Sequence, residues 1–113
     1  MLERDFQAHL IREIKERLPG SVVLKTDPNY IQGFPDLLVL YGRHWGALEV
    51  KRNAKAHKQP NQSYYVETLG KMSYAGFIHP ENEKEILYEL QQALKPDRPA
   101  RFSKRQRLPL DQL

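Results

Sequence analysis

The sequence predicts a single α/β domain in which helices flank a mixed central sheet. Three short strand-like runs follow one another between residues 21 and 52, a helical stretch comes next, and a fourth strand-like run follows it. Successive strands favour antiparallel pairing, whereas a strand reached through a helix crossover can pair parallel to its neighbour. A chain of 113 residues is one domain by length and can enclose a single hydrophobic core.

The first half of the chain begins with a helix. Apolar residues recur at helical spacing over residues 2–18, and Pro19-Gly20 ends the pattern. Ser21–Thr26 is short and β-branched, which predicts a strand. A loop rich in proline and glycine leads to two further strands, Asp36–Tyr41 and Trp45–Arg52.

The second half contains a helix, a strand and a helix. Pro60 suits the first position of a helix, which we expect to run to about Ala75. Gly76–His79 reads as the fourth strand. Asn82 is a predicted cap, with Glu85 as its capping-box partner, for a helix that ends near residue 95. The predicted order is therefore α-β-β-β-α-β-α.

Composition excludes several classes of protein. The chain has no cysteine, so a disulfide framework, a thiolate zinc site and a thiol nucleophile are excluded. No apolar run is long enough to cross a bilayer, and the first residues lack the layout of a signal peptide. We therefore expect a cytosolic protein with no membrane partner.

Positive charge is concentrated at the C-terminal end. The net charge is +4, and the surplus carried from Lys95 onward equals all of it. We divide the chain into a domain over residues 1–95 and a basic, proline-containing tail over residues 96–113. Such a tail suits a polyanionic partner such as nucleic acid, through Arg101, Lys104 and Arg105. A solvated, disordered tail would explain the same charge.

Charged side chains interrupt the second and third strands. Asp36 opens one strand, and Glu49 and Lys51 lie inside the next. Burying such charges costs several kcal/mol unless partners or a metal compensate. Because side chains alternate along a strand, Glu49 and Lys51 point to the same face, roughly 6–7 Å apart. If the two strands form a hairpin, Asp36 lies near both, and the three groups meet at one edge of the sheet.

A divalent cation would resolve the repulsion between two clustered carboxylates. Mg²⁺ binds one or two carboxylates together with water and a substrate phosphate. A lysine beside such a site can contact the phosphate or the attacking water, as metal-assisted phosphodiester hydrolysis requires. The alternative is a salt-bridged cluster in which Lys51 pairs with Asp36 or Glu49, although buried pairs are seldom net stabilising.

The same residues form a motif. Pro35-Asp36, then a hydrophobic strand, then Glu49-Val50-Lys51 is similar to the motif of the PD-(D/E)xK nuclease superfamily. The wider context runs from GFPDLLVL through GALEVK to KQPNQSYYVETLGKMSYAGFI. It resembles the small stand-alone VRR-Nuc domains of phages and bacteria, which act as structure-selective nucleases. The resemblance covers roughly residues 3–79 and implies a restriction-endonuclease-like core.

The resemblance also implies roles for the motif residues. Asp36 and Glu49 would bind the metal, helped by the backbone carbonyl of Val50. Lys51 would orient or activate the water and stabilise charge on the phosphate. The cofactor would be Mg²⁺, with Mn²⁺ able to substitute.

Two residues outside the motif are carried over from the same resemblance. Gln62 matches a glutamine that this family often carries at the start of the second helix, and Gln59 is the competing candidate. A polar residue at a helix start is the alternative explanation for Gln62. Glu3 shares the apolar face of the first helix, so its carboxylate is expected to face inward, and the resemblance implies that it is a metal-linked glutamate. The alternative is an acid favoured by the helix dipole, worth about 0.3–1 kcal/mol.

Three lysines are expected to bind nucleic acid. Lys25 ends the first strand, and Lys55 and Lys58 lie in the basic loop after the motif. The loop over residues 27–33 flanks the proposed site and could also contact DNA. Solvated surface charge explains each lysine equally well. None of the four histidines shows the spacing of metal ligands.

Together these features predict a Mg²⁺-dependent endodeoxyribonuclease that acts on branched DNA such as four-way junctions. Symmetric cleavage of a junction needs two active sites, so we expect a homodimer. The resemblance places it in the cytoplasm of a bacterial or phage-infected cell. The alternatives are a nuclease for flap, nicked or duplex DNA, a non-catalytic DNA-binding module on a nuclease-like fold, or a subunit that needs a partner chain for DNA targeting.

Overall fold

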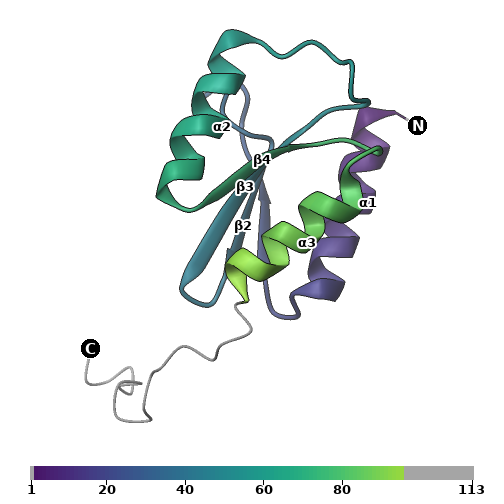
Figure 1. The fold of residues 1–113 in the computed structure, drawn as a ribbon, viewed down its shortest axis with the longest axis vertical. Helices are drawn as coiled ribbons and strands as arrows, with labels where there is room; N and C mark the ends of the chain where they lie inside the picture. Colours follow the sequence, from purple (N-terminus) through teal and green to yellow (C-terminus); the bar gives the residue numbers. More distant parts are fainter. Residues whose placement is uncertain (1, 96–113) are drawn as a thin grey trace.

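The computed structural model describes residues 2–95, which form a sheet with helices on both sides (Figure 1). The tail over residues 96–113, with its predicted DNA-binding residues Arg101, Lys104 and Arg105, lies outside the described residues. The elements are α1 (Glu3–Arg17), β1 (Val22–Lys25), β2 (Leu37–Tyr41), β3 (His44–Val50), α2 (Pro60–Met72), β4 (Tyr74–Ile78) and α3 (Glu83–Leu94). This is the predicted order of elements.

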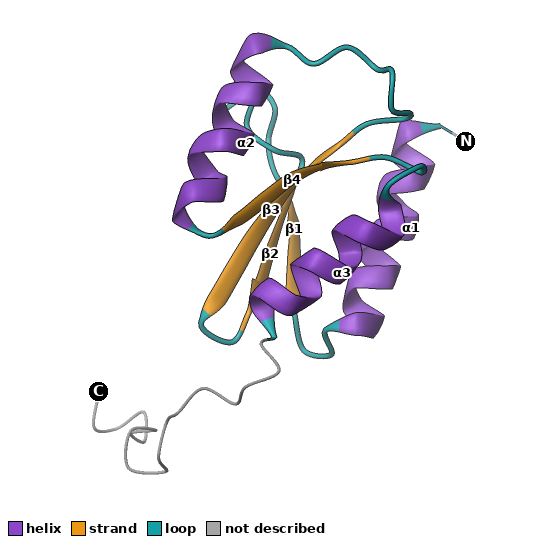
Figure 2. Ribbon diagram, in the orientation of Figure 1, coloured by secondary structure: helices purple, strands orange, loops and turns teal. Residues whose placement is uncertain are grey.

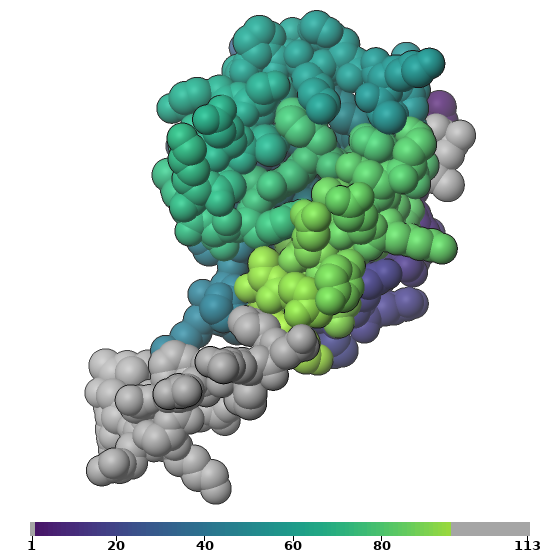
Figure 3. All heavy atoms as spheres, viewed as in Figure 1, coloured from purple at the N-terminus to yellow at the C-terminus, as the bar shows by residue number. Residues whose placement is uncertain are grey.

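The four strands form a mixed sheet in the order β1-β2-β3-β4. β1 pairs with β2, and β2 with β3, in antiparallel fashion, whereas β3 and β4 are parallel. The short turn between β2 and β3 requires an antiparallel pair, and the crossover through α2 brings β4 back in the parallel direction. The β2–β3 turn projects at the lower left of the space-filling view (Figure 3).

The main hydrophobic core lies between the sheet and the pair α1 and α3, which cover the same face (Figure 2). The helices contribute Phe6, Leu10, Ile14, Leu18, Leu87, Leu90 and Leu94, and the sheet contributes Leu37, Val39, Leu48, Val50 and Ile78. α2 lies on the opposite side (Figure 2). Alternation along β3 therefore turns Leu48 and Val50 toward α1 and α3, and Glu49 toward α2.

Two local expectations differ from the structure. α2 ends at Met72 and not near Ala75, because the Ser73 amide closes the last turn onto the Leu69 carbonyl and Tyr74 then pairs with Gly46 of β3. Parallel pairing thus assigns Tyr74 and Ala75 to the strand. Asn82 precedes α3, but the predicted capping box with Glu85 is wrong. The Asn82 side chain accepts from the His79 amide and donates to the Phe77 carbonyl, so it closes the end of β4.

Within residues 2–95, none of the helices combines the length and the apolar character that a membrane crossing requires.

Candidate active site

The end of the β2–β3 hairpin brings Asp36 and Glu49 together. Leu37 is paired with Leu48, so Asp36, one residue earlier, meets Glu49, one residue later, on the α2 side of the sheet. Asp36 is held in place because its Oδ2 accepts a hydrogen bond of 2.8 Å from the Val50 amide. Glu49 is almost fully buried, with 3% of its surface exposed. The local strand geometry that the sequence predicted is therefore present.

Crowding at this position changes the acidity of Glu49. Burial, then the charge of Asp36 and a hydrogen bond with Asp36, raise the pKa of Glu49 from 4.5 to about 9, and the Lys51 ammonium offsets part of this increase. A carboxyl group with such a pKa holds a proton at neutral pH unless positive charge is added next to it. The surroundings of Glu49 therefore favour its neutral form as long as no further positive charge is present.

Lys51 is buried on the same side and is held by three oxygen atoms. Its Nζ donates to the Gln62 Oε1 at 2.7 Å and to the His57 carbonyl at 2.9 Å, and lies 3.9 Å from the Glu49 Oε2. A buried ammonium needs such partners because it has left water. The interaction with Glu49 was one of the pairings expected for a salt-bridged cluster.

Gln62 links Lys51 to Glu49. Its Oε1 accepts from Lys51, and its Nε2 donates to the Glu49 Oε2 at 3.2 Å. The same Oε1 accepts from the backbone amide of Gln59, at the start of α2. Gln62 and not Gln59 thus provides the side chain that contacts both charged groups.

The loop between β1 and β2 packs against the first turns of α2. Asn61 donates to the Gln32 carbonyl at 3.1 Å, and the Phe34 ring lies 5.6 Å from that of Tyr65. Gly33 has a φ of +87°, and a Cβ there would overlap the Asn61 side chain. Only glycine combines this backbone conformation with this close approach. The loop that leads into Asp36 is therefore fastened to the helix that carries Gln62.

Glu3 and Val50 are the two remaining residues of the expected ligand set. Glu3 lies in the first turn of α1 and is exposed as a whole residue, and its role as a metal-linked ligand stays a prediction. Partial burial and the charge of Asp36 still raise the pKa of Glu3, which shows that its carboxylate feels this site. Val50 contacts Asp36 through its amide; the ligand role of its carbonyl stays a prediction.

The predicted DNA-binding lysines lie on the surface around the site. Lys25 is exposed at the end of β1, and Lys55 and Lys58 are exposed in the loop that follows Lys51. The Lys58 Nζ lies 4.4 Å above the ring of Phe77 on β4. Their roles in binding nucleic acid stay predictions.

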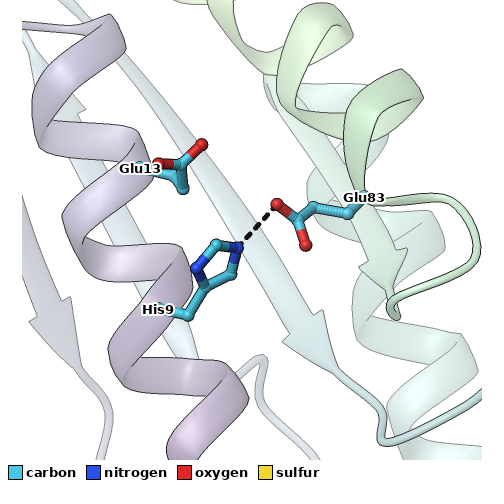
Figure 4. Close-up of side chains that lie close together, drawn as sticks. All are labelled: His9, Glu13 and Glu83. Atoms are coloured by element: carbon cyan, nitrogen blue, oxygen red, sulfur yellow. Dashed lines mark hydrogen bonds and ion pairs between the residues drawn. The ribbon is translucent and has the colours of Figure 1, made fainter.

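A separate polar cluster joins α1 to α3 (Figure 4). Among residues 2–95, His9, Glu13 and Glu83 form the one group of three or more His, Asp or Glu residues whose ligand atoms all lie within 4.8 Å of one another. The His9 Nε2 is 2.8 Å from the Glu83 Oε2, so the pair already ties the two helices together. Asp36, Glu49 and Glu3 do not form such a group. This cluster was not predicted from the sequence, although the spacing of His9 and Glu13 places them on one face of the helix.

Comparisons with known proteins connect this geometry to a fold family. No protein-family model matches the chain, and no curated protein matches it. A solved structure described as a VRR_NUC domain protein is similar over 84% of this chain and 89% of its own, with a TM-score of 0.64 and 19% identity. The chain has the fold of a VRR_NUC domain. A second VRR_NUC domain structure is similar over 80% of this chain and 96% of its own, with a TM-score of 0.52 and 22% identity.

A third solved structure is Archaeoglobus fulgidus Hjc, described as a Holliday junction resolvase. It is similar over 67% of each chain, with 15% identity and a TM-score of 0.48, below the level at which the two folds can be equated. The similarity to the first VRR_NUC structure confirms the predicted α/β architecture, a mixed sheet flanked by helices. In this fold the Asp36–Glu49 pair lies where β2 begins and β3 ends, beneath the start of α2.

Proposed function

We propose that the protein is a divalent-cation-dependent DNA endonuclease that hydrolyses phosphodiester bonds at the cluster of Asp36, Glu49 and Lys51. One observation carries the proposal: Asp36 and Glu49 meet at one edge of the sheet, where burial, and then the charge of Asp36, raise the pKa of Glu49 to about 9. A structure maintains such a conflict at a cost in stability, and strongly perturbed carboxyl groups cluster at functional sites. The VRR_NUC fold supports the same assignment.

The donor set fits a hard divalent cation. Asp36 and Glu49 offer adjacent carboxylate oxygens, and the Val50 carbonyl is the third candidate ligand. Mg²⁺ or Mn²⁺ held there would supply the positive charge that lowers the pKa of a water molecule and polarises the phosphate. Its arrival would release the proton from Glu49, because added positive charge favours the ionised form.

Lys51 is the residue that acts on the phosphate. Gln62 and the His57 carbonyl fix its ammonium beside Glu49, so the charge is oriented before a substrate arrives. Fixed charge directed at the position where negative charge develops lowers the barrier without reorganisation at the moment of reaction. Gln62 is a positioning residue, because it contacts both Lys51 and Glu49.

We further propose that the preferred DNA is branched, such as a four-way junction, and that the protein acts as a homodimer in the cytoplasm of a bacterial or phage-infected cell. The resemblance of the motif and its context to stand-alone VRR-Nuc domains supports this choice. Exposed Lys25, Lys55 and Lys58 lie on elements that adjoin the site, where they can contact phosphates on either side of the cleaved bond.

Cleavage of matched DNA substrates tests the proposal. A labelled four-way junction would be compared with linear duplex, flap and single-stranded DNA of the same sequence, in Mg²⁺, in Mn²⁺ and in chelator. We expect Lys51→Ala to abolish cleavage, with Lys84→Ala as the control because Lys84 is exposed on α3, on the other side of the sheet. Cleavage of flaps or duplex instead would support the proposed hydrolysis but refute the preference for a four-way junction. Binding without cleavage in either metal would replace the enzyme with a DNA-binding module.

A further inference from the structure

A pocket of about 300 Å³ opens beside the candidate active site. Its lining is mostly apolar and comes from the loop that follows β1 and leads to Asp36: Thr26, Asp27, Tyr30, Ile31 and Phe34. The volume is at the small end of the range of about 300–1,000 Å³ for ligand pockets. The pocket is therefore suited to one small flat group and not to a large ligand.

The pocket is connected directly to Asp36. The Thr26 amide donates to the Asp36 carbonyl at 2.9 Å, and the Thr26 hydroxyl donates to the Pro35 carbonyl at 2.6 Å. Phe34, which also lines the pocket, packs on Tyr65 of α2, one turn after Gln62. A group seated in the pocket would thus lie beside the strand end that carries the candidate metal ligand.

The lining offers flat aromatic surface together with one hydrogen-bond acceptor. Tyr30 is 83% exposed, so its ring is available to contact a partner. The Asp27 Oδ1 accepts from the Asn29 amide at 2.8 Å, which orients the carboxylate and leaves lone pairs for a further donor. Exposed Lys25 directly precedes Thr26 and adds a cation at the same end of β1. An aromatic face, an acceptor and an adjacent cation suit a base, its N–H donors and its backbone phosphate respectively.

We propose that this pocket holds one unpaired nucleobase of the DNA strand, stacked on Tyr30 and hydrogen-bonded by Asp27. The inference rests on the proposed function, which makes DNA the partner, and specifies how that site selects its substrate. A base inside a continuous duplex is stacked and paired, and its removal costs energy that an already unpaired base does not require. The pocket therefore favours DNA with an unpaired nucleotide near the cut, such as a branch point or a bulge, over continuous duplex.

Binding measured in chelator tests the pocket without cleavage. The probe is a labelled duplex with a single unpaired 2-aminopurine, compared with the fully paired duplex of the same sequence. We expect Tyr30→Ala to weaken binding of the bulged duplex by about tenfold, as the loss of one base–aromatic stack implies. Binding of the paired duplex should change less than twofold. The 2-aminopurine fluorescence should fall on binding of the wild type and not of the variant.

Two further variants separate stacking from other effects. Tyr30→Phe keeps the ring and should retain binding of the bulged duplex within twofold. Tyr88→Ala removes another exposed tyrosine, which lies on α3 and is 59% exposed, and should leave the binding of both substrates unchanged. Because Tyr30 is so exposed, its truncation removes no core packing and the variant should fold.

The proposal would be overturned if Tyr30→Ala weakened binding of both duplexes equally, or weakened binding of neither. Cleavage in Mg²⁺, measured in parallel, distinguishes this failure from that of the nuclease. If the wild type cuts DNA, and Tyr30→Ala discriminates bulged from paired DNA as well as the wild type does, the base-binding role of the pocket is refuted and the nuclease assignment stands. If nothing is cut but the selective binding loss persists, the nuclease assignment fails and the base pocket stands.

Discussion

Replacing Glu49 by glutamine should change how stability depends on pH in the cation-free protein. The folded pKa of Glu49, about 9, lies above its ordinary value of 4.5, so between these pH values the folded state binds a proton that the unfolded state has lost. Stability therefore falls as pH rises through this window, by up to about 1.4 kcal/mol per pH unit. From pH 5 to pH 8 the wild type should lose up to about 4 kcal/mol from this group.

Glu49→Gln keeps the shape of the side chain and cannot ionise, so this loss should disappear. The assay is urea unfolding of both proteins in chelator at pH 5, 6.5 and 8. The difference in unfolding free energy isolates Glu49 and the charged groups next to it, because the remaining groups titrate alike in both proteins. We expect the unfolding free energy of the variant, relative to that of the wild type, to increase at each step from pH 5 to pH 8.

Mg²⁺ supplies the second half of the test. A cation that binds the folded state stabilises it by mass action. Added Mg²⁺ should therefore raise the stability of the wild type most at pH 8, where loss of the Glu49 proton is least costly, and should have little effect on Glu49→Gln. Parallel stability curves for the two proteins in chelator would refute the reasoning, because Glu49 would then ionise as an ordinary carboxyl group.

Two further substitutions test the framework around the site. Gln62→Ala removes the contacts to Lys51 and Glu49 and should slow cleavage about 10- to 100-fold. Ser63→Ala, at the exposed next position of α2, should leave the cleavage rate unchanged. Equal cleavage rates for the two variants would contradict a positioning role for Gln62. Gly33→Ala should lower the unfolding free energy by about 2–3 kcal/mol, because φ is +87° and the new Cβ overlaps Asn61. Gly42→Ala, with a φ of +59° and open space around it, should lower the unfolding free energy by only about 1 kcal/mol when measured by urea unfolding. Similar decreases in unfolding free energy at both positions would exclude the contact with Asn61 as the cause.

The sequence by itself determined the order of elements and the meeting of Asp36, Glu49 and Lys51. Both depend on short-range rules: a brief turn makes neighbouring strands antiparallel, and side chains alternate along each strand. Those rules place Glu49 and Lys51 on one face and bring Asp36 to the same end, as the pairing of Leu37 with Leu48 bears out. The motif was recognisable for the same reason, because its residues lie on one hairpin.

Only the tertiary structure decided the features that depend on how separate elements pack. The choice of Gln62 over Gln59 depends on the rotation of α2 above β3, and the end of α2 at Met72 depends on the pairing of Tyr74 with Gly46. The His9–Glu83 contact likewise joins segments far apart in the chain, and the exposure of Glu3 and the pocket beside Asp36 depend on how the chain folds around them. Hydrophobic periodicity shows which face of a helix is buried, but not which residue of another element it meets, because that depends on the position and angle at which the elements pack.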